Sequence, residues 1–247
     1  MSEREGTVVI VGATSSIARE LSRRMVWRGK RTLLAARDAA ELSRCSADLR
    51  IRSGRDVEEL EWPEEPGGSV ELARRIISRL RPGPIFLAMC VGYLGDQALA
   101  DVDPAERARI RQANLEIPVE VIEELLPAMT KQGGSILALS SVAGDRVRPS
   151  NALYGAAKAG LNAYLEALRL RTRRSSLRIV TAKLGPVATR MTFGMGRLPL
   201  MISPSRAAEL IDKRLDRAEV IYVPSVWAPI MAAIRLIPEP IFRRMTF

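Results

Sequence analysis

The chain has 247 residues, with 38 lysines and arginines, 28 aspartates and glutamates and no histidine. Its length suits one sizeable core, so we expect residues 1–247 to form a single domain. Without histidine, the chain cannot use Ser-His-Asp or Cys-His catalysis, and it lacks the commonest zinc and iron ligand, so we expect no metal site.

The net charge of +10 is spread along the chain. It predicts a solvated basic surface that helps to attract anionic molecules. No nucleic-acid motif accompanies it, so we expect no nucleic-acid partner. Two cysteines give no disulfide framework, residues 1–6 do not resemble a secretion signal, and no segment has the roughly 18 uninterrupted apolar residues typical of a membrane span. The expected compartment is the cytoplasm.

Apolar runs and helical patterns alternate along the chain. We expect strands at residues 7–11, 30–36, 57–62, 85–91, 135–140, 177–184 and 220–223. We expect helices at residues 16–28, 38–50, 70–80, 104–129, 154–172 and 204–215, with Pro118 kinking or ending the long one. This order predicts an α/β fold: a Rossmann-like, doubly wound parallel sheet of about seven strands with helices on both faces.

The turn after the first expected strand is made of small residues. Such a turn lets the backbone approach a pyrophosphate, which the N-terminus of the next helix then faces. The residues that we expect to bind a dinucleotide here are Gly12, Thr14, Ser15, Ser16 and Ile17. Because Gly12 is the one glycine of the turn, a capped turn without a ligand is the alternative.

The second expected strand ends in Ala36-Arg37-Asp38. An acidic residue at this point would bind the ribose 2′-hydroxyl of NAD, whereas a cation suits the 2′-phosphate of NADP. Arg37 therefore favours NADP(H) over NAD(H). In the alternative interpretation, Arg37 is a surface residue and Asp38 binds the ribose.

The second half of the chain carries a family resemblance. Ser141 precedes Tyr154 by 13 residues, and Lys158 follows Tyr154 by four. These spacings, within the stretches 139–144 and 154–158, resemble the short-chain dehydrogenase/reductase family, and the resemblance covers nearly the whole chain. Asn114 matches the helix asparagine of that family.

The resemblance implies that Asn114, Ser141, Tyr154 and Lys158 catalyse hydride transfer between a nicotinamide and a carbonyl or secondary alcohol. Residues four apart on a helix share a face, so Lys158 can lower the pKa of Tyr154 from its usual value of about 10. Tyr154 could then exchange a proton with the substrate. Ser141 would hold the substrate oxygen, Lys158 would also hold the ribose, and Asn114 would anchor a water that leads protons to Lys158.

The resemblance also implies cofactor contacts at other strand ends. Glu61, with Trp62 as the alternative, ends the third expected strand, where relatives bind adenine, and Gly92 follows the fourth. Gly185, Val187 and Thr189 belong to a stretch similar to the segment that covers the nicotinamide. We interpret Cys90 as a core thiol rather than a ligand.

Residues 225–247 are apolar and then basic. They could lie on a membrane surface, pack over the active site or form a subunit interface. Residues 191–201, rich in methionine and glycine, are interpreted as a mobile substrate lid.

The tail and the stretches 93–97 and 143–146 resemble a subgroup that reduces lipid-linked keto-sugars, of the decaprenylphosphoryl-ribose type. This implies a small-molecule or lipid-linked carbonyl substrate and a cytoplasmic enzyme that touches the membrane peripherally. The alternatives are an acyl-chain or steroid-like alcohol dehydrogenase and a non-catalytic NADP(H)-binding regulatory protein. Relatives imply a homodimer or homotetramer.

Overall fold

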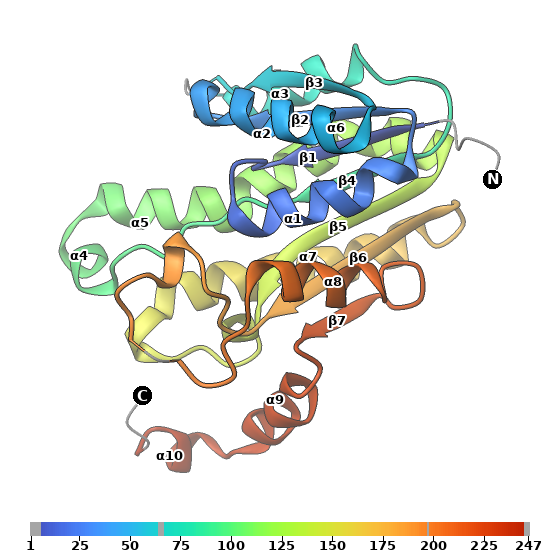
Figure 1. The fold of residues 1–247 in the computed structure, drawn as a ribbon. Helices are drawn as coiled ribbons and strands as arrows, with labels where there is room; N and C mark the ends of the chain where they lie inside the picture. The colour runs from blue at the N-terminus through green and yellow to red at the C-terminus, as the bar shows by residue number, and fades with distance from the viewer. Residues whose placement is uncertain (1–5, 64–66, 197, 245–247) are drawn as a thin grey trace.

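The computed structural model describes residues 6–63, 67–196 and 198–244 (Figure 1). Its centre is one seven-stranded sheet in the order β3-β2-β1-β4-β5-β6-β7, in which every neighbouring pair is parallel. The strands are β1 Thr7–Val11, β2 Arg31–Ala36, β3 Asp56–Glu61, β4 Ile85–Met89, β5 Gly134–Ser141, β6 Leu177–Leu184 and β7 Val220–Val223. The predicted fold class is confirmed.

Helices connect the strands and cover both faces of the sheet (Figure 1). They are α1 Ser16–Met25, α2 Ala39–Ser53, α3 Gly68–Ile77, α4 Gln97–Val102, α5 Pro104–Arg111, α6 Ile117–Gln132, α7 Ala152–Thr172, α8 Pro204–Asp212, α9 Trp227–Leu236 and α10 Glu239–Phe242. The sequence did not predict α4, α9 or α10. Among the described helices, none is both long and apolar enough to cross a bilayer.

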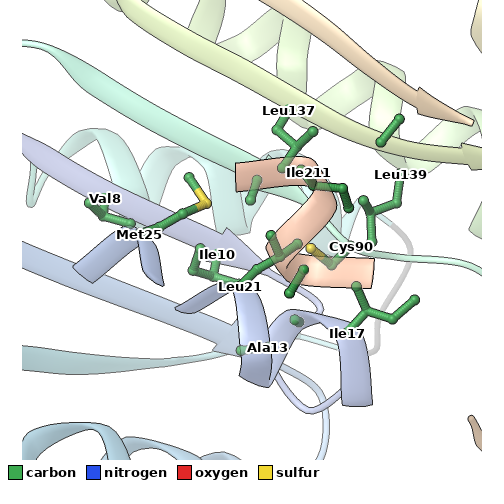
Figure 2. Close-up of a cluster of buried hydrophobic side chains, with 14 of the residues drawn as sticks. Val8, Ile10, Ala13, Ile17, Leu21, Met25, Cys90, Leu137, Leu139 and Ile211 are labelled. Carbon is green, nitrogen blue, oxygen red and sulfur yellow. The ribbon is translucent and has the colours of Figure 1, made fainter. Parts of the chain in front are cut away.

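Two hydrophobic cores lie on opposite faces of the sheet. Val8 and Ile10 of β1 belong to a core that includes residues of α1, α2 and α8, part of which Figure 2 shows. Val9 and Val11 belong to a core that includes residues of α3, α6 and α7. Alternate side chains of a strand point to opposite faces, and both faces of β1 are buried, so its sequence is apolar throughout.

The long helix expected at residues 104–129 is interrupted earlier than Pro118. Between α5 and α6 lies η2, a widened π-type turn at Gln112–Glu116, in which the Ile117 N–H bonds to the Gln112 carbonyl. Pro118 lies in the first turn of α6. It lacks the N–H that would otherwise bond to the Asn114 carbonyl. The interruption therefore surrounds Asn114.

The C-terminal arm, defined here as residues 225–244, holds α9 and α10 and extends from β7 (Figure 1). At one point the indole of Trp227 packs so closely on Gly185, at the end of β6, that a Cβ there would collide with it. At a second point Arg146 lies 4.2 Å above the centre of the Phe242 ring and donates to the Ile237 carbonyl at 3.3 Å. These contacts join the arm to the body of the protein.

Candidate active site

A cleft of about 810 Å³ opens beyond the carboxyl ends of the strands. Parallel α/β sheets bind their ligands at this edge. Among the residues predicted to bind the cofactor or to catalyse the reaction, those that line the cleft are Ser15, Ser16, Ile17, Arg37, Gly92, Tyr154, Lys158 and Thr189, whereas Asn114 and Ser141 are not lining residues. They come from segments far apart in the sequence, and the parallel topology brings them together.

The turn between β1 and α1 forms one corner of the cleft. The Ser15 hydroxyl oxygen accepts from the Ala18 N–H at 3.1 Å and so caps α1. The N–H groups of Ser16 and Ile17 are at the start of the helix, where no intrahelical partner exists. Backbone donors, serine hydroxyls and the positive end of a helix dipole suit a phosphate group.

Gly12 has a structural reason to be glycine. Its φ is +83°, and a Cβ would lie 2.9 Å from the Cys90 carbonyl oxygen. Gly12 thus lets the turn approach the segment after β4, which fits the predicted role of the turn without itself lining the cleft. Thr14 lies in the same turn, half-buried and also outside the lining.

Arg37 and Asp38 have different surroundings. Arg37 is exposed and lines the cleft at the end of β2. The Asp38 carboxylate instead accepts from the Glu41 N–H at 2.9 Å and caps α2. This geometry favours Arg37 over Asp38 as the residue nearest a bound nucleotide.

Tyr154 lines the floor of the cleft, whereas Ser141, at the end of β5, is not among the lining residues; each is 9% exposed. Burial raises the pKa of Tyr154, and the hydrogen bond with Ser141 partly counters this. The sequence predicted that Lys158 lowers this pKa. The structure shows the opposite direction, because removal of the phenol from water outweighs the hydrogen bond. Tyr154 therefore keeps its proton at neutral pH.

Lys158 is also buried, at 3% exposed. Its Nζ donates to the Leu139 carbonyl at 3.0 Å and lies 5.9 Å from the centre of the Tyr154 ring. Burial lowers the pKa of Lys158 to about 8, and the nearby Cys90 thiol opposes this weakly. The ammonium form thus predominates at neutral pH but is lost only slightly above it.

Asn114 is fully buried, and its side chain hydrogen-bonds to the backbone of the segment that lines the cleft. Its Nδ2 donates to the Tyr93 carbonyl at 2.6 Å and to the Ile110 carbonyl at 2.8 Å, while its Oδ1 accepts from the Tyr93 N–H at 3.3 Å. A Cβ on Gly92 would lie 3.3 Å from Asn114 Oδ1 and 3.7 Å from Lys158 Nζ. Asn114 and Lys158 therefore both lie close to Gly92.

The remaining predicted contacts are less uniform. Glu61 is exposed at the end of β3 and does not line the cleft. Thr189 lines it, whereas Val187 is buried and pairs with Ile202. At Gly185, the indole of Trp227 fills the space that a side chain would take.

Cys90 belongs to the core on the α1 side of the sheet and also lines the cleft, and burial raises the pKa of its thiol to about 12. A thiol that stays protonated is a poor nucleophile and a poor metal ligand. This agrees with its interpretation as a core residue.

Sequence reasoning missed Arg109 and Arg190, which line the cleft. Tyr93 and Asp96 also line it, within the stretch 93–97 that carried the subgroup resemblance, and Met191 lines it at the start of the segment interpreted as a substrate lid. The one available signal was the spacing of Glu106 and Arg109, which places both on one face of α5. Nothing in the sequence showed that this face meets Tyr93.

Comparison with known proteins gives a consistent result. A family model described as short chain dehydrogenase matches residues 6–196. An uncharacterized oxidoreductase of Mycobacterium tuberculosis is 36% identical over 96% of both chains, and one of Streptomyces coelicolor is 30% identical over 97% of this chain and 95% of its own length. A short-chain dehydrogenase of Sphingobium yanoikuyae, solved in complex with NADPH, superposes with a TM-score of 0.81 at 23% identity, covering 94% of this chain and 96% of its own.

Proposed function

The chain belongs to the short-chain dehydrogenase family, and we propose that it uses NADP(H) to interconvert a carbonyl group and an alcohol. The observation that carries the proposal is the buried group at the floor of the cleft. There the phenol of Tyr154, the hydroxyl of Ser141 and the ammonium of Lys158 come together from β5 and α7.

Tyr154 is the proton donor in reduction. Its raised pKa keeps the phenol protonated until a carbonyl oxygen accepts the proton. Ser141 donates a hydrogen bond to the same oxygen and fixes its position. The Lys158 ammonium stabilises the phenolate that remains, and it is the charged form below a pKa of about 8.

The donor set of the cleft fits a dinucleotide phosphate. The start of α1 with Ser15 and Ser16 would hold the pyrophosphate, and Arg37 would hold the 2′-phosphate. Lys158 and Tyr154 would hold the ribose, and Gly92 and Thr189 line the adjoining walls. When bound, NADP(H) supplies or accepts the hydride. The NADPH complex of the Sphingobium yanoikuyae protein is in keeping with this assignment.

Asn114 has a positioning role in this scheme. Its side chain is engaged on both sides by Tyr93 and Ile110. Its main-chain carbonyl lacks the usual helical donor, because residue 118 is proline. We propose that this carbonyl holds the water that returns a proton to Lys158.

The substrate is proposed to be a hydrophobic ketone, with lipid-linked keto-sugars as the leading class. Large apolar side chains follow Thr189 and stand in solvent: Met191, which lines the cleft, is 39% exposed, and Phe193 is 91% exposed. Met195 and Leu200 continue the exposed set. Apolar side chains beside a cleft suit a substrate with a long apolar portion.

The C-terminal arm is proposed to contact either an anionic membrane surface, with the enzyme otherwise cytoplasmic, or a second copy of the chain. Leu236 is 82% exposed and Ile241 is 57% exposed, beside Arg235 and Arg243. The described lining of the cleft contains no residue of this arm, which argues against its acting as a cover for the active site. Salt-sensitive sedimentation with anionic vesicles, lost on deleting residues 225–247, would favour the membrane; concentration-dependent dimerisation would favour the second copy.

A ketone screen with NADPH tests the proposed function. Wild-type protein is expected to oxidise NADPH in the presence of a substrate, and Tyr154→Phe is expected to lose turnover while NADPH fluorescence titration shows unchanged affinity. Tyr164→Phe is the matched control, since Tyr164 lies on the same helix and its hydroxyl donates to Glu123 at 2.8 Å. Wild-type activity in Tyr154→Phe would overturn the mechanism.

A further inference from the structure

Tyr93 forms a rigid platform on one wall of the cleft. Asn114 holds its backbone N–H and carbonyl, as described above. Its phenol donates to Glu106 Oε1 at 3.0 Å, and the Asp96 N–H donates to the same oxygen at 3.0 Å. Glu106 is 5% exposed, so this hydrogen bond is shielded from water. The ring is thus held at both ends.

Arg109 lies across this platform. Its Cζ is 4.1 Å from the centre of the Tyr93 ring, and Arg109 lines the cleft that holds Tyr154. Stacking on an aromatic ring leaves the edge of a guanidinium free to donate. Within the described part of the chain Arg109 makes no ion pair, in contrast to Arg111, which pairs with Glu116 at 3.1 Å on the same stretch of chain.

The charges that line the cleft exceed what the cofactor assignments use. Arg37 and the start of α1 are assigned to the phosphates of NADP(H), and Lys158 to the ribose. Arg109, from α5, and Arg190, from the segment after Thr189, remain. Among the described lining residues the one acid is Asp96. Its Oδ1 accepts from the Ala98 N–H at 2.9 Å and so caps α4.

We propose that Arg109, held in place by Tyr93 and Glu106, is the anion-binding residue of the substrate subsite, and that the substrate is a ketone that carries a phosphate ester. The planar fork of a guanidinium matches two phosphoryl oxygens. Arg190 adds a second positive charge from another element, and two cations suit a phosphate dianion. This inference rests on the proposed function, because it takes Tyr154 as the place where the ketone reacts.

Binding of dihydroxyacetone phosphate to protein saturated with NADP⁺ tests the inference. The oxidised cofactor occupies its own phosphate sites and cannot reduce the ketone. Calorimetry is expected to show that the phosphate ester binds wild type, that Arg109→Gln weakens this binding about tenfold or more, and that Arg109→Lys is intermediate. Dihydroxyacetone, which lacks the phosphate, is expected to bind both proteins with equal weakness. Arg111→Gln is the matched control and is expected to bind the ester as wild type does.

Two results would overturn the inference: equal affinity of wild type and Arg109→Gln for the phosphate ester, or no binding of the ester to wild type. A parallel loss of NADP⁺ affinity in Arg109→Gln would also overturn it, since Arg109 would then belong to the cofactor site. Failure of the proposed function looks different. In that case NADP⁺ does not bind wild type, or Tyr154→Phe still turns over, and the inference falls with it.

Discussion

Tyr154 and Lys158, which line the floor of the cleft, and Asn114 and Ser141, which lie next to it, are no more than 9% exposed and are called the floor residues here, whereas Arg37, Arg109 and Arg190 at the rim are in solvent. Asn114 is held by three hydrogen bonds and Lys158 by one, and burial shifts the pKa values of Tyr154 and Lys158. The rim residues offer exposed charges, and of the three Arg109 is stacked on the Tyr93 ring. In the proposed function, the floor therefore sets the reaction and the rim selects the molecules that undergo it.

The largest expected effect is on the floor. Lys158→Met is expected to lower kcat for ketone reduction by roughly 10²- to 10⁴-fold, because the phenolate of Tyr154 loses its neighbouring cation. Steady-state kinetics measures the loss. A decrease of less than about threefold would show that the floor does not set the reaction.

Lys158→Met should also change how the stability of the protein depends on pH. The pKa of Lys158 is about 8 in the folded protein against 10.5 for an ordinary lysine, so between these values the unfolded chain binds more protons and wild-type stability rises with pH. Below pH 8 the Lys158 amine is charged in both the folded and the unfolded chain, so burying that charge destabilises the folded protein in full, on the order of 3 kcal/mol. The stability advantage of Lys158→Met should therefore be greatest below pH 8 and shrink towards pH 10.5, as urea unfolding can measure. A difference that does not vary with pH would contradict the burial of a titrating amine.

Asn114→Ala is expected to have the next largest effect. It removes three hydrogen bonds inside the protein and releases Tyr93. The expected destabilisation is about 2–4 kcal/mol. Asn114 has a positioning role in the proposed scheme, so kcat should fall; because Tyr93 also supports Arg109, KM should rise as well. If the variant is as stable as wild type, the floor is less tightly held than the hydrogen bonds indicate.

Arg37→Gln tests the rim at the cofactor end. Loss of the cation is expected to weaken NADPH binding by about tenfold, since a hydrogen-bonded charge pair is worth about 1.5–3 kcal/mol when both partners are held. Affinity for NADH should change by less than about twofold. Fluorescence titration with both cofactors decides it, and an equal loss for the two would mean that Arg37 does not face the 2′-phosphate.

The smallest expected effect lies outside the cleft. Arg146→Ala removes the stacking on Phe242 and the bond to the Ile237 carbonyl. The cost to global stability should be under about 1 kcal/mol. Hydrogen exchange should nevertheless speed up at α10, with turnover unchanged. Unaltered exchange at α10 would show that this contact does not hold the arm.

The sequence allowed most of the fold to be predicted, and the reason is visible in β1. A strand covered on both faces is continuously apolar, so Thr7–Val11 could be recognised without any knowledge of its neighbours. The helices of the C-terminal arm could not be recognised in the same way. α9 is apolar on more than one side, with Leu236 exposed and Met231 buried, so it lacks a clear helical pattern.

The candidate site shows the same division. Ser141, Tyr154 and Lys158 lie on two elements that follow one another in the chain, and their fixed spacing made them visible. Arg109 stacks on Tyr93, 16 positions earlier, and Asn114 donates a hydrogen bond to the carbonyl of the same residue, 21 positions earlier. Such contacts depend on how β4 and α5 meet in space. The pKa of Tyr154 also had to come from the structure, because it depends on burial as well as on neighbouring charge.

Deuterium transfer tests the central claim most directly. NADPH deuterated at the transferable position of the nicotinamide is incubated with the protein and a ketone substrate, and the alcohol product is analysed by mass spectrometry. One deuterium is expected on the carbinol carbon with wild type and none above background with Tyr154→Phe, although both proteins bind NADPH. Product without deuterium would contradict hydride transfer from the nicotinamide to the carbonyl carbon. Equal labelling by Tyr154→Phe would contradict the role of this tyrosine as the proton donor to the carbonyl oxygen.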